Sequence, residues 1–169
     1  GKKTGATTTK RIGVTRAHLE EDAGKSIHDV AVAGADGTHI DLNRAGVPLL
    51  EIVSEPDLRS AVEAGAYLRT LRSILRYIEV SDADMEKGQF RCDANVSLRL
   101  RGSEEFGTRT ETKNFNSFRN VEGAIVAAII RQADILDAGG ELQQPTMAYD
   151  VDRRRPPLLP LQATPHDYR

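Results

Sequence analysis

One short segment of the sequence alternates polar and apolar residues in a way that could line up chemical groups. In Arg91–Leu100, RCDANVSLRL, the odd-numbered residues are polar and the even-numbered residues are apolar. Because a β-strand points successive side chains to opposite faces, a strand here would present one polar row. That row contains Arg91, Asp93, Asn95, Ser97 and Arg99. Cys92 falls on the apolar face, where we expect it to pack as a small buried residue.

A second polar row follows in TRTETKN, residues 108–114. If a hairpin pairs odd residues with odd residues, Asp93 and Glu111 project from the same face. The cations that would share this face are Arg91, Arg99, Arg109 and Lys113. Carboxylate oxygens are ligands for Mg²⁺, and arginine and lysine neutralise phosphates, so such a face could bind magnesium and a nucleotide. Other acidic residues come from separate segments: Glu20, Glu21, Asp22 and Glu86.

The same polar face has a simpler interpretation. It could be a solvent-exposed sheet surface with cross-strand ion pairs, each worth only about 0.2–1 kcal/mol. Composition and spacing alone favour this simpler interpretation, because alternation does not show that a face is concave.

The elements that must position these residues are hairpins. The alternation predicts paired strands over residues 91–101 and 107–114. A second hairpin is predicted over residues 27–42, with turn residues in GADG. A further strand is predicted over residues 47–53, entered through Pro48, where a missing N–H is tolerated.

Two amphipathic helices are predicted between and after the strands. Ser60 and Glu63 have capping-box spacing, and apolar residues at steps of three and four predict a helix over residues 61–78. Asn116 or Ser117 can cap a second helix. Its apolar positions and the glycines that end it are Val121, Ile125, Ile129, Leu136, Gly139 and Gly140. Helices interleaved with hairpins predict the α+β class, an antiparallel β-sheet with flanking helices.

Composition narrows the possible functions. The chain has 169 residues, enough for one domain with a core, and a formal net charge of −2. This charge argues against a surface built mainly for nucleic acid. A single cysteine excludes an internal disulfide and a cysteine-rich zinc site. Without an apolar run long enough to cross a bilayer, we expect a reducing, cytoplasmic environment and no membrane partner.

Four long and unusual motifs carry a resemblance to a known family. In chain order they are HLEEDAGKSIHD, DLNRAGVPLLEIVSEPD, RCDANVSLR and EEFGTRTETKNFNSF. By these motifs the sequence resembles the B-subunit family of the aspartyl/glutamyl-tRNA(Asn/Gln) amidotransferases, from about Arg11 to about Asp150. We therefore expect a polar N-terminal stretch at residues 1–10, a central part of the catalytic domain at 11–150, and an irregular Pro- and Arg-rich tail at 151–169.

The resemblance implies a defined reaction. The B-subunit would use ATP and Mg²⁺ to phosphorylate the side-chain carboxylate of Glu-tRNA(Gln) or Asp-tRNA(Asn). Ammonia released from glutamine by the amidase, the A-subunit, would then displace the phosphate, while a small C-subunit joins the two larger ones. The resemblance also implies a catalytic domain with an antiparallel sheet, similar to that of glutamine synthetase.

The resemblance assigns roles by motif position. It implies the Mg²⁺ ligands Glu21, Glu86, Asp93 and Glu111. It implies phosphate or carboxylate contacts from the catalytic residues Arg91, Arg109 and Lys113. The residues that would orient the substrate or brace the ligands are Asn95, Asn114 and Asn116. Each of these asparagines could equally make a structural hydrogen bond in a turn or a ladder.

The resemblance further implies a central piece of a longer subunit. The family's first strand, with a glutamate and a histidine at the metal site, is expected before Gly1, and the tRNA-binding helical region after Arg169. The isolated piece is expected to have little or no amidotransferase activity, and residues 152–164 do not match the family. Two alternatives are a non-catalytic RNA- or protein-binding module that uses Arg153–Arg155, and a structural scaffold whose acidic face binds no metal.

Overall fold

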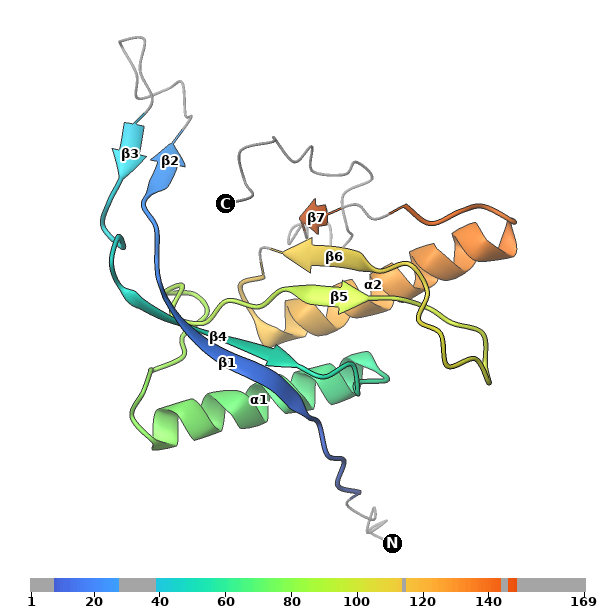
Figure 1. The fold of residues 1–169 in the computed structure, drawn as a ribbon, viewed down its shortest axis with the longest axis horizontal. Coiled ribbons are helices and arrows are strands. Elements are labelled where there is room, and N and C mark those ends of the chain that lie inside the picture. Colours follow the sequence, from blue (N-terminus) through green and yellow to red (C-terminus); the bar gives the residue numbers. More distant parts are fainter. Residues whose placement is uncertain (1–7, 28–38, 114, 144–145, 149–169) are drawn as a thin grey trace, which may run out of the picture. The chain divides into compact units, whose positions relative to one another are not determined.

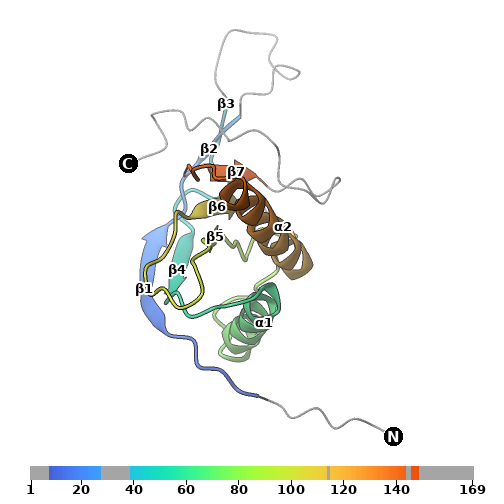
Figure 2. The same ribbon diagram turned by 90° about the vertical axis from the view of Figure 1, so that its right-hand side faces the viewer.

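The computed structural model describes residues 8–27, 39–113, 115–143 and 146–148. Contacts divide the chain into two compact units, Gly1–Leu58 and Arg59–Arg169. Figure 1 and Figure 2 show the elements of each unit in colours that follow the sequence. Neither of the helices that the structure describes is long and apolar enough to cross a membrane.

The first unit consists of antiparallel strand pairs. Strand β1 (Val14–Glu21) pairs with β4 (Pro48–Ser54), and β2 (Lys25–Ile27) pairs with β3 (His39–Asp41). β4 confirms the strand predicted over residues 47–53. β2 and β3 pair in the antiparallel sense predicted for the second hairpin, whose turn lies outside the described residues.

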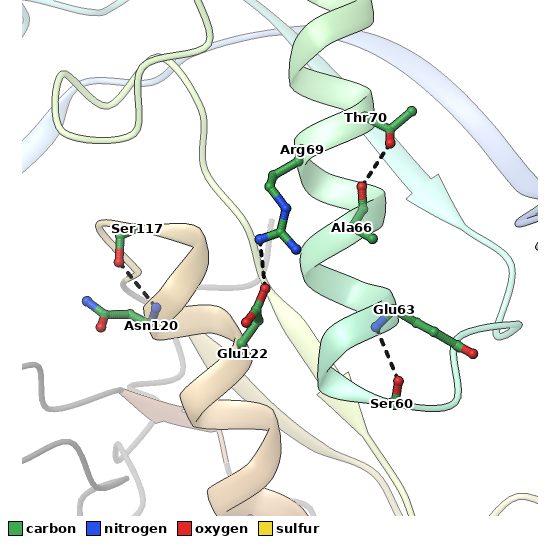
Figure 3. Close-up of polar contacts among 8 residues, drawn as sticks. All are labelled: Ser60, Glu63, Ala66, Arg69, Thr70, Ser117, Asn120 and Glu122. Carbon is green, nitrogen blue, oxygen red and sulfur yellow. Dashed lines mark hydrogen bonds and ion pairs between the residues drawn. The ribbon is translucent and has the colours of Figure 1, made fainter. Parts of the chain in front are cut away.

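The second unit begins with helix α1 (Ala61–Tyr77), which confirms the helix predicted over residues 61–78. The Ser60 hydroxyl accepts a hydrogen bond from the Glu63 backbone N–H at 3.2 Å, as Figure 3 shows. The Glu63 carboxylate accepts from the Arg59 N–H at 2.7 Å, one residue earlier than in a strict capping box. Both contacts satisfy N–H groups that have no partner inside the helix.

Helix α2 (Phe118–Asp137) is the longer helix of the second unit. Ser117 is its N-cap and accepts from the Asn120 N–H at 3.2 Å, which decides between the two predicted caps (Figure 3). α1 and α2 pack closely at Gly65, because a Cβ added there would overlap Glu122 Oε1. The Glu122 carboxylate pairs with Arg69 of α1 at 2.8 Å.

A small sheet packs against α2. Its strand order is β5 (Ala94–Val96), β6 (Thr110–Lys113) and β7 (Thr146–Ala148), with β5–β6 antiparallel and β6–β7 parallel. Figure 1 and Figure 2 both show β5 and β6 alongside α2. The predicted antiparallel pairing of residues 91–101 with 107–114 is confirmed, but both strands are shorter than predicted.

The strands end early because other contacts take over. The Leu98 N–H donates to a helix side chain, Gln132, at 3.1 Å rather than to the ladder. Arg99 then binds the Glu104 carbonyl at 3.0 Å, and its guanidinium lies 5.1 Å from the centre of the Phe106 ring. These contacts shape residues 98–106 as a loop. Leu100 is 84% exposed, so its predicted place on the apolar face is wrong.

The core of the second unit lies between α1, α2 and β5. Its buried members are Leu68, Ala94, Phe115, Val121 and Ala124. The most buried positions of α2 are Val121, Ala124, Ala128 and Gln132, which differ in part from the predicted apolar stripe. Leu136 is 45% exposed, so its predicted burial is wrong. Ala124 and Ala128 are among these buried positions, where small side chains let the helix approach its neighbours closely.

The α+β class is confirmed, with small antiparallel sheets and two helices in the described residues. The structure differs from the prediction in how the strands are arranged. Instead of one antiparallel sheet, the described strands form three small sheets, and the third includes the parallel pair β6–β7. This parallel pair joins segments more than thirty positions apart in the sequence, Glu111 with Thr146, and no local pattern announces such a pairing.

Candidate functional site

The register of β5 with β6 decides which polar residues share a face. Asn95 pairs with Glu111 and Ala94 with Thr112, so odd residues pair with odd residues. Continuing this register by one position places Asp93 opposite Lys113. Because opposite residues in an antiparallel pair project from the same face, Asp93 and Glu111 lie on one side of the sheet. This geometry is the one on which the predicted shared face depended.

Lys113 lies between the two carboxylates. Its Nζ is 3.4 Å from Asp93 Oδ2 and 3.6 Å from Glu111 Oε1. The side chains of Lys113, Asp93 and Glu111 are 42%, 48% and 30% exposed, so this cluster is open to solvent. We call these three residues the Asp93–Lys113–Glu111 cluster.

The charges of the cluster favour the protonated form of Lys113. Burial acts to lower the pKa of Lys113, but the carboxylates of Asp93 and Glu111 act in the opposite direction and prevail, so its pKa lies above the usual value. The two carboxylates therefore stabilise positive charge at the position between them. Desolvation alone would have the opposite effect on a lysine.

This donor set fits a hard divalent cation. Mg²⁺ is usually held by one or two protein carboxylates and completes its shell with water and substrate phosphates. Asp93 and Glu111 are two carboxylates on one face, and in this structure both pair with the Lys113 ammonium group. Among the residues that the structure describes, no group of three histidine, cysteine, aspartate or glutamate side chains forms a complete metal site.

The other two predicted metal ligands lie elsewhere. Glu86 is exposed in the loop after α1, and its N–H donates to Asp84 Oδ1 at 3.0 Å. It does not join Asp93 and Glu111 in a three-ligand group within the described residues. Glu21 is exposed at the end of β1, opposite Pro48, and belongs to the first unit. The structure thus brings together two of the four predicted ligands within the second unit.

Three of the other predicted site residues, Arg91, Asn95 and Arg109, lie in or next to the same strands. Arg91 precedes β5 and Arg109 immediately precedes β6, and both are exposed. Asn95 is exposed and lies opposite Glu111 in the ladder. Asn116 accepts a hydrogen bond at Oδ1 from Asn120 Nδ2 at the start of α2, which is a structural contact. Asn114 lies outside the described residues, as does Arg153–Arg155 of the alternative RNA-binding module.

Cys92 packs on the apolar side as predicted, but it is partly rather than fully buried. It lies against the core of the second unit, and its thiol is 3.8 Å from the Asp93 carbonyl oxygen. Burial, and to a smaller extent the charge of Asp93, raises the pKa of Cys92 to about 12. A thiol with such a pKa holds its proton near neutral pH, so it is unsuited to be a nucleophile.

Sequence reasoning missed the burial of three polar residues in the described part of the chain: Thr110, Thr112 and Gln132. Gln132 of α2 is 0% exposed and Thr110 of β6 is 1% exposed. The Gln132 amide reaches the Val96 carbonyl at 2.8 Å and Thr110 Oγ1 at 3.3 Å. Arg131 also donates to Thr110 Oγ1, at 2.9 Å. The signal that could have revealed Gln132 is a polar residue at helical spacing on the same stripe as Val121 and the small alanines.

A hollow of about 390 Å³ lies elsewhere in the second unit. Leu98, Gly107 and Leu136 are among its lining residues, and none of the predicted site residues lines it. Gly107 is required beside this hollow, because a Cβ there would overlap the Leu98 carbonyl oxygen. The Asp93–Lys113–Glu111 cluster therefore lies away from this hollow, on an open face.

Comparisons of the sequence with known proteins all point to one family. Residues 2–169 match the family described as the GatB/GatE catalytic domain. The chain is 59% identical over 162 residues, 96% of its length, to the aspartyl/glutamyl-tRNA(Asn/Gln) amidotransferase B-subunit of Coxiella burnetii (strain RSA 493 / Nine Mile phase I). It is 57% identical over 161 residues, 95% of its length, to the B-subunit of Oleidesulfovibrio alaskensis. In each case the chain spans 33% of the relative's length.

Proposed function

Because the chain belongs to the GatB/GatE catalytic domain family, we propose that it supplies part of the surface on which a misacylated tRNA is amidated. The substrate would be Glu-tRNA(Gln) or Asp-tRNA(Asn), which matches the names of the relatives. The reaction would use ATP, and its partners would be the amidase A-subunit and a small C-subunit. The observation that carries this proposal is the placement of Asp93 and Glu111 on one face with Lys113 between them.

The chemistry explains why such a face is useful. A carboxylate is a poor electrophile because its charge repels nucleophiles and oxide is a poor leaving group. In the proposed reaction a side-chain carboxylate oxygen of the aminoacyl group attacks the γ-phosphorus of ATP, and ADP leaves. Ammonia then attacks the acyl carbon, and inorganic phosphate leaves with the former carboxylate oxygen. Both steps require neutralisation of several negative charges at one place.

The residues of the cluster suit this task. Asp93 and Glu111 would hold Mg²⁺ through hard oxygen ligands, and the metal, when bound, would neutralise the triphosphate and screen it from the carboxylate. Lys113 would contact a phosphate oxygen as a compact positive charge, and Arg91 and Arg109 would add planar bidentate donors. A catalytic domain similar to that of glutamine synthetase is part of the same proposal.

The roles proposed for Asp93 and Glu111 can be tested in the full-length protein assembled with its partner subunits. Asp93→Asn and Glu111→Gln each keep size and polarity but remove one negative charge. Both should lose ATP-dependent formation of the acyl phosphate and of the amide, by at least about a hundredfold, because each removes a charged ligand. The matched control is Glu104→Gln, because Glu104 is an exposed loop residue. Near-normal amidation by either site variant would remove that residue from the site.

A structural scaffold is the second candidate, and one observation favours it. Within the described residues the cluster forms ion pairs of the kind found on solvated sheet faces, and no three-ligand metal group is present. Mg²⁺ titration of the chain, followed by NMR of the side-chain carboxylates, separates the two functions. Carboxyl shifts at Asp93 and Glu111 that saturate support the catalytic proposal. Shifts that are absent or equal to those of Glu104 support the scaffold.

A further inference from the structure

We infer that Gln132 is a positioning residue for this site: its buried amide fixes β5 against β6 in the one register that brings Asp93, Lys113 and Glu111 together. Gln132 lies on α2 and is 0% exposed, although amide side chains are usually exposed. A polar group so deeply buried is costly unless its hydrogen bonds are made. Its contacts go to Val96 at the end of β5, to Leu98 just beyond that end, and to Thr110 at the start of β6.

The contacts of Gln132 imitate those of a neighbouring strand. Its Nε2 donates to the Val96 carbonyl at 2.8 Å, and its Oε1 accepts from the Leu98 N–H at 3.1 Å. The carbonyl of one residue and the N–H of the second residue after it point to the same side of an extended segment. A single side-chain amide therefore satisfies two backbone groups of β5 and its continuation.

The same amide reaches the partner strand. Nε2 is 3.3 Å from Thr110 Oγ1, and Thr110 is the residue that pairs with Val96. Arg131 donates to the same hydroxyl oxygen at 2.9 Å. Gln132 and Arg131 of α2 therefore both contact Thr110 Oγ1 of β6. The pair Val96–Thr110 is thus held from outside the sheet by the helix.

Such support matters because the strands are short. β5 has three residues and β6 has four, which is a small ladder to specify a register. A slip by one residue would turn Glu111 to the other face, and a slip by two would separate Asp93 from Lys113. Either slip would also remove Thr110 from the Gln132 amide. The effect of Gln132 on catalysis rests on the proposed function, whereas its effect on the pairing of β5 with β6 does not.

The test uses NMR on the 169-residue chain with Gln132→Met, which keeps the length of the side chain and removes its hydrogen bonds. Hydrogen exchange at the Leu98 amide should become at least about tenfold faster relative to amides of α1, because its buried acceptor is lost. The nuclear Overhauser contact between the Asp93 Cβ protons and the Lys113 Cε protons should weaken by at least about half as other registers are populated. Gln89→Met, which alters an exposed glutamine of the same unit, should change neither quantity.

Each outcome decides the inference. A folded Gln132→Met chain that keeps both the slow Leu98 exchange and the full Asp93–Lys113 contact overturns it. If that variant does not fold, Thr110→Val and Thr110→Ser replace it: the valine variant should weaken the Asp93–Lys113 contact and the serine variant should preserve it. Equal contacts in both overturn the inference. Absence of a Mg²⁺ response in the unsubstituted chain would refute the metal site but leave these measurements to decide the role of Gln132.

Discussion

Replacing Lys113 with methionine is the most direct test of the candidate site. The change removes a positive charge that lies 3.4 Å from Asp93 and 3.6 Å from Glu111, and it keeps most of the aliphatic chain. All three side chains are substantially exposed, so each ion pair is worth about 0.2–1 kcal/mol rather than the larger value of a buried pair. We therefore expect the free energy of unfolding to fall by only about 0.5–2 kcal/mol at low salt, and by less at high salt.

The same substitution should strengthen the binding of Mg²⁺. Lys113 and a metal would compete for the negative charge between the two carboxylates. Two unit charges about 4 Å apart interact by about 1 kcal/mol in water, and a divalent ion feels about twice that repulsion from the ammonium group. We expect Mg²⁺ to bind about tenfold more tightly to Lys113→Met in low salt. In the full-length protein, ATP-dependent amidation should nevertheless fall, because the phosphate contact proposed for Lys113 would be lost.

Isothermal calorimetry and carboxyl NMR measure this effect directly. Lys87→Met is the matched control, because Lys87 is an exposed lysine of the same unit that pairs with Asp84 at 3.7 Å. It should leave Mg²⁺ binding unchanged. If Lys113→Met and the unsubstituted chain bind Mg²⁺ with equal affinity at low salt, the cluster does not act as a cation site and the reasoning is refuted.

The pH dependence of stability gives an independent check on Lys113. Its pKa is raised in the folded chain, since the two carboxylates outweigh the effect of burial. Its contribution to stability is therefore fully present below the unfolded pKa of about 10.4 and is lost as the pH rises through the folded pKa. Urea unfolding of the unsubstituted chain should show this loss above about pH 10.4, and Lys113→Met should remove that part of the profile.

Three further predictions concern packing and capping. Iodoacetamide should modify Cys92 at pH 8 at least about a hundredfold more slowly in the native chain than in urea, because its pKa is about 12; comparable rates would contradict its burial. Gly65→Ala should destabilise the chain by about 1–3 kcal/mol in urea unfolding, because the added Cβ would meet Glu122. In a Glu122→Ala background the same change should stabilise the chain by about 0.5–1 kcal/mol, because alanine favours the helix more than glycine does. Ser60→Ala should cost about 1 kcal/mol by loss of the N-cap, whereas Ser73→Ala inside the same helix should be nearly neutral. Equal effects at the two serines would refute the capping role.

The sequence predicted those features that local patterns control. Ser60 with Glu63 marks the start of α1, and alternation in RCDANVSLRL marks the apolar side occupied by Ala94 and the polar side occupied by Asp93. Each signal depends on neighbours within a few residues. Helix caps and strand faces are therefore visible without knowledge of the rest of the chain.

The features that were missed depend on distant partners. Periodicity predicted an apolar face on α2 but not which residues of that face are most buried. Ala124 and Ala128 are buried there because close packing favours small side chains. The burial of Gln132 depends on hydrogen bonds to Val96, 36 residues earlier. The parallel pairing of β6 with β7 is equally non-local. None of these can be derived from propensity or spacing within one element.

The chemistry of the candidate site follows from a single offset between two short strands. Odd–odd pairing puts Asp93 and Glu111 on one face, but several offsets satisfy that condition. The observed one, with Asn95 opposite Glu111, also puts Lys113 opposite Asp93 and so places a cation between two acids. Neither strand is long enough to select this offset by its own ladder. The helix selects it through Gln132 and Thr110, so the polar face becomes a possible site only once α2 has packed on the sheet.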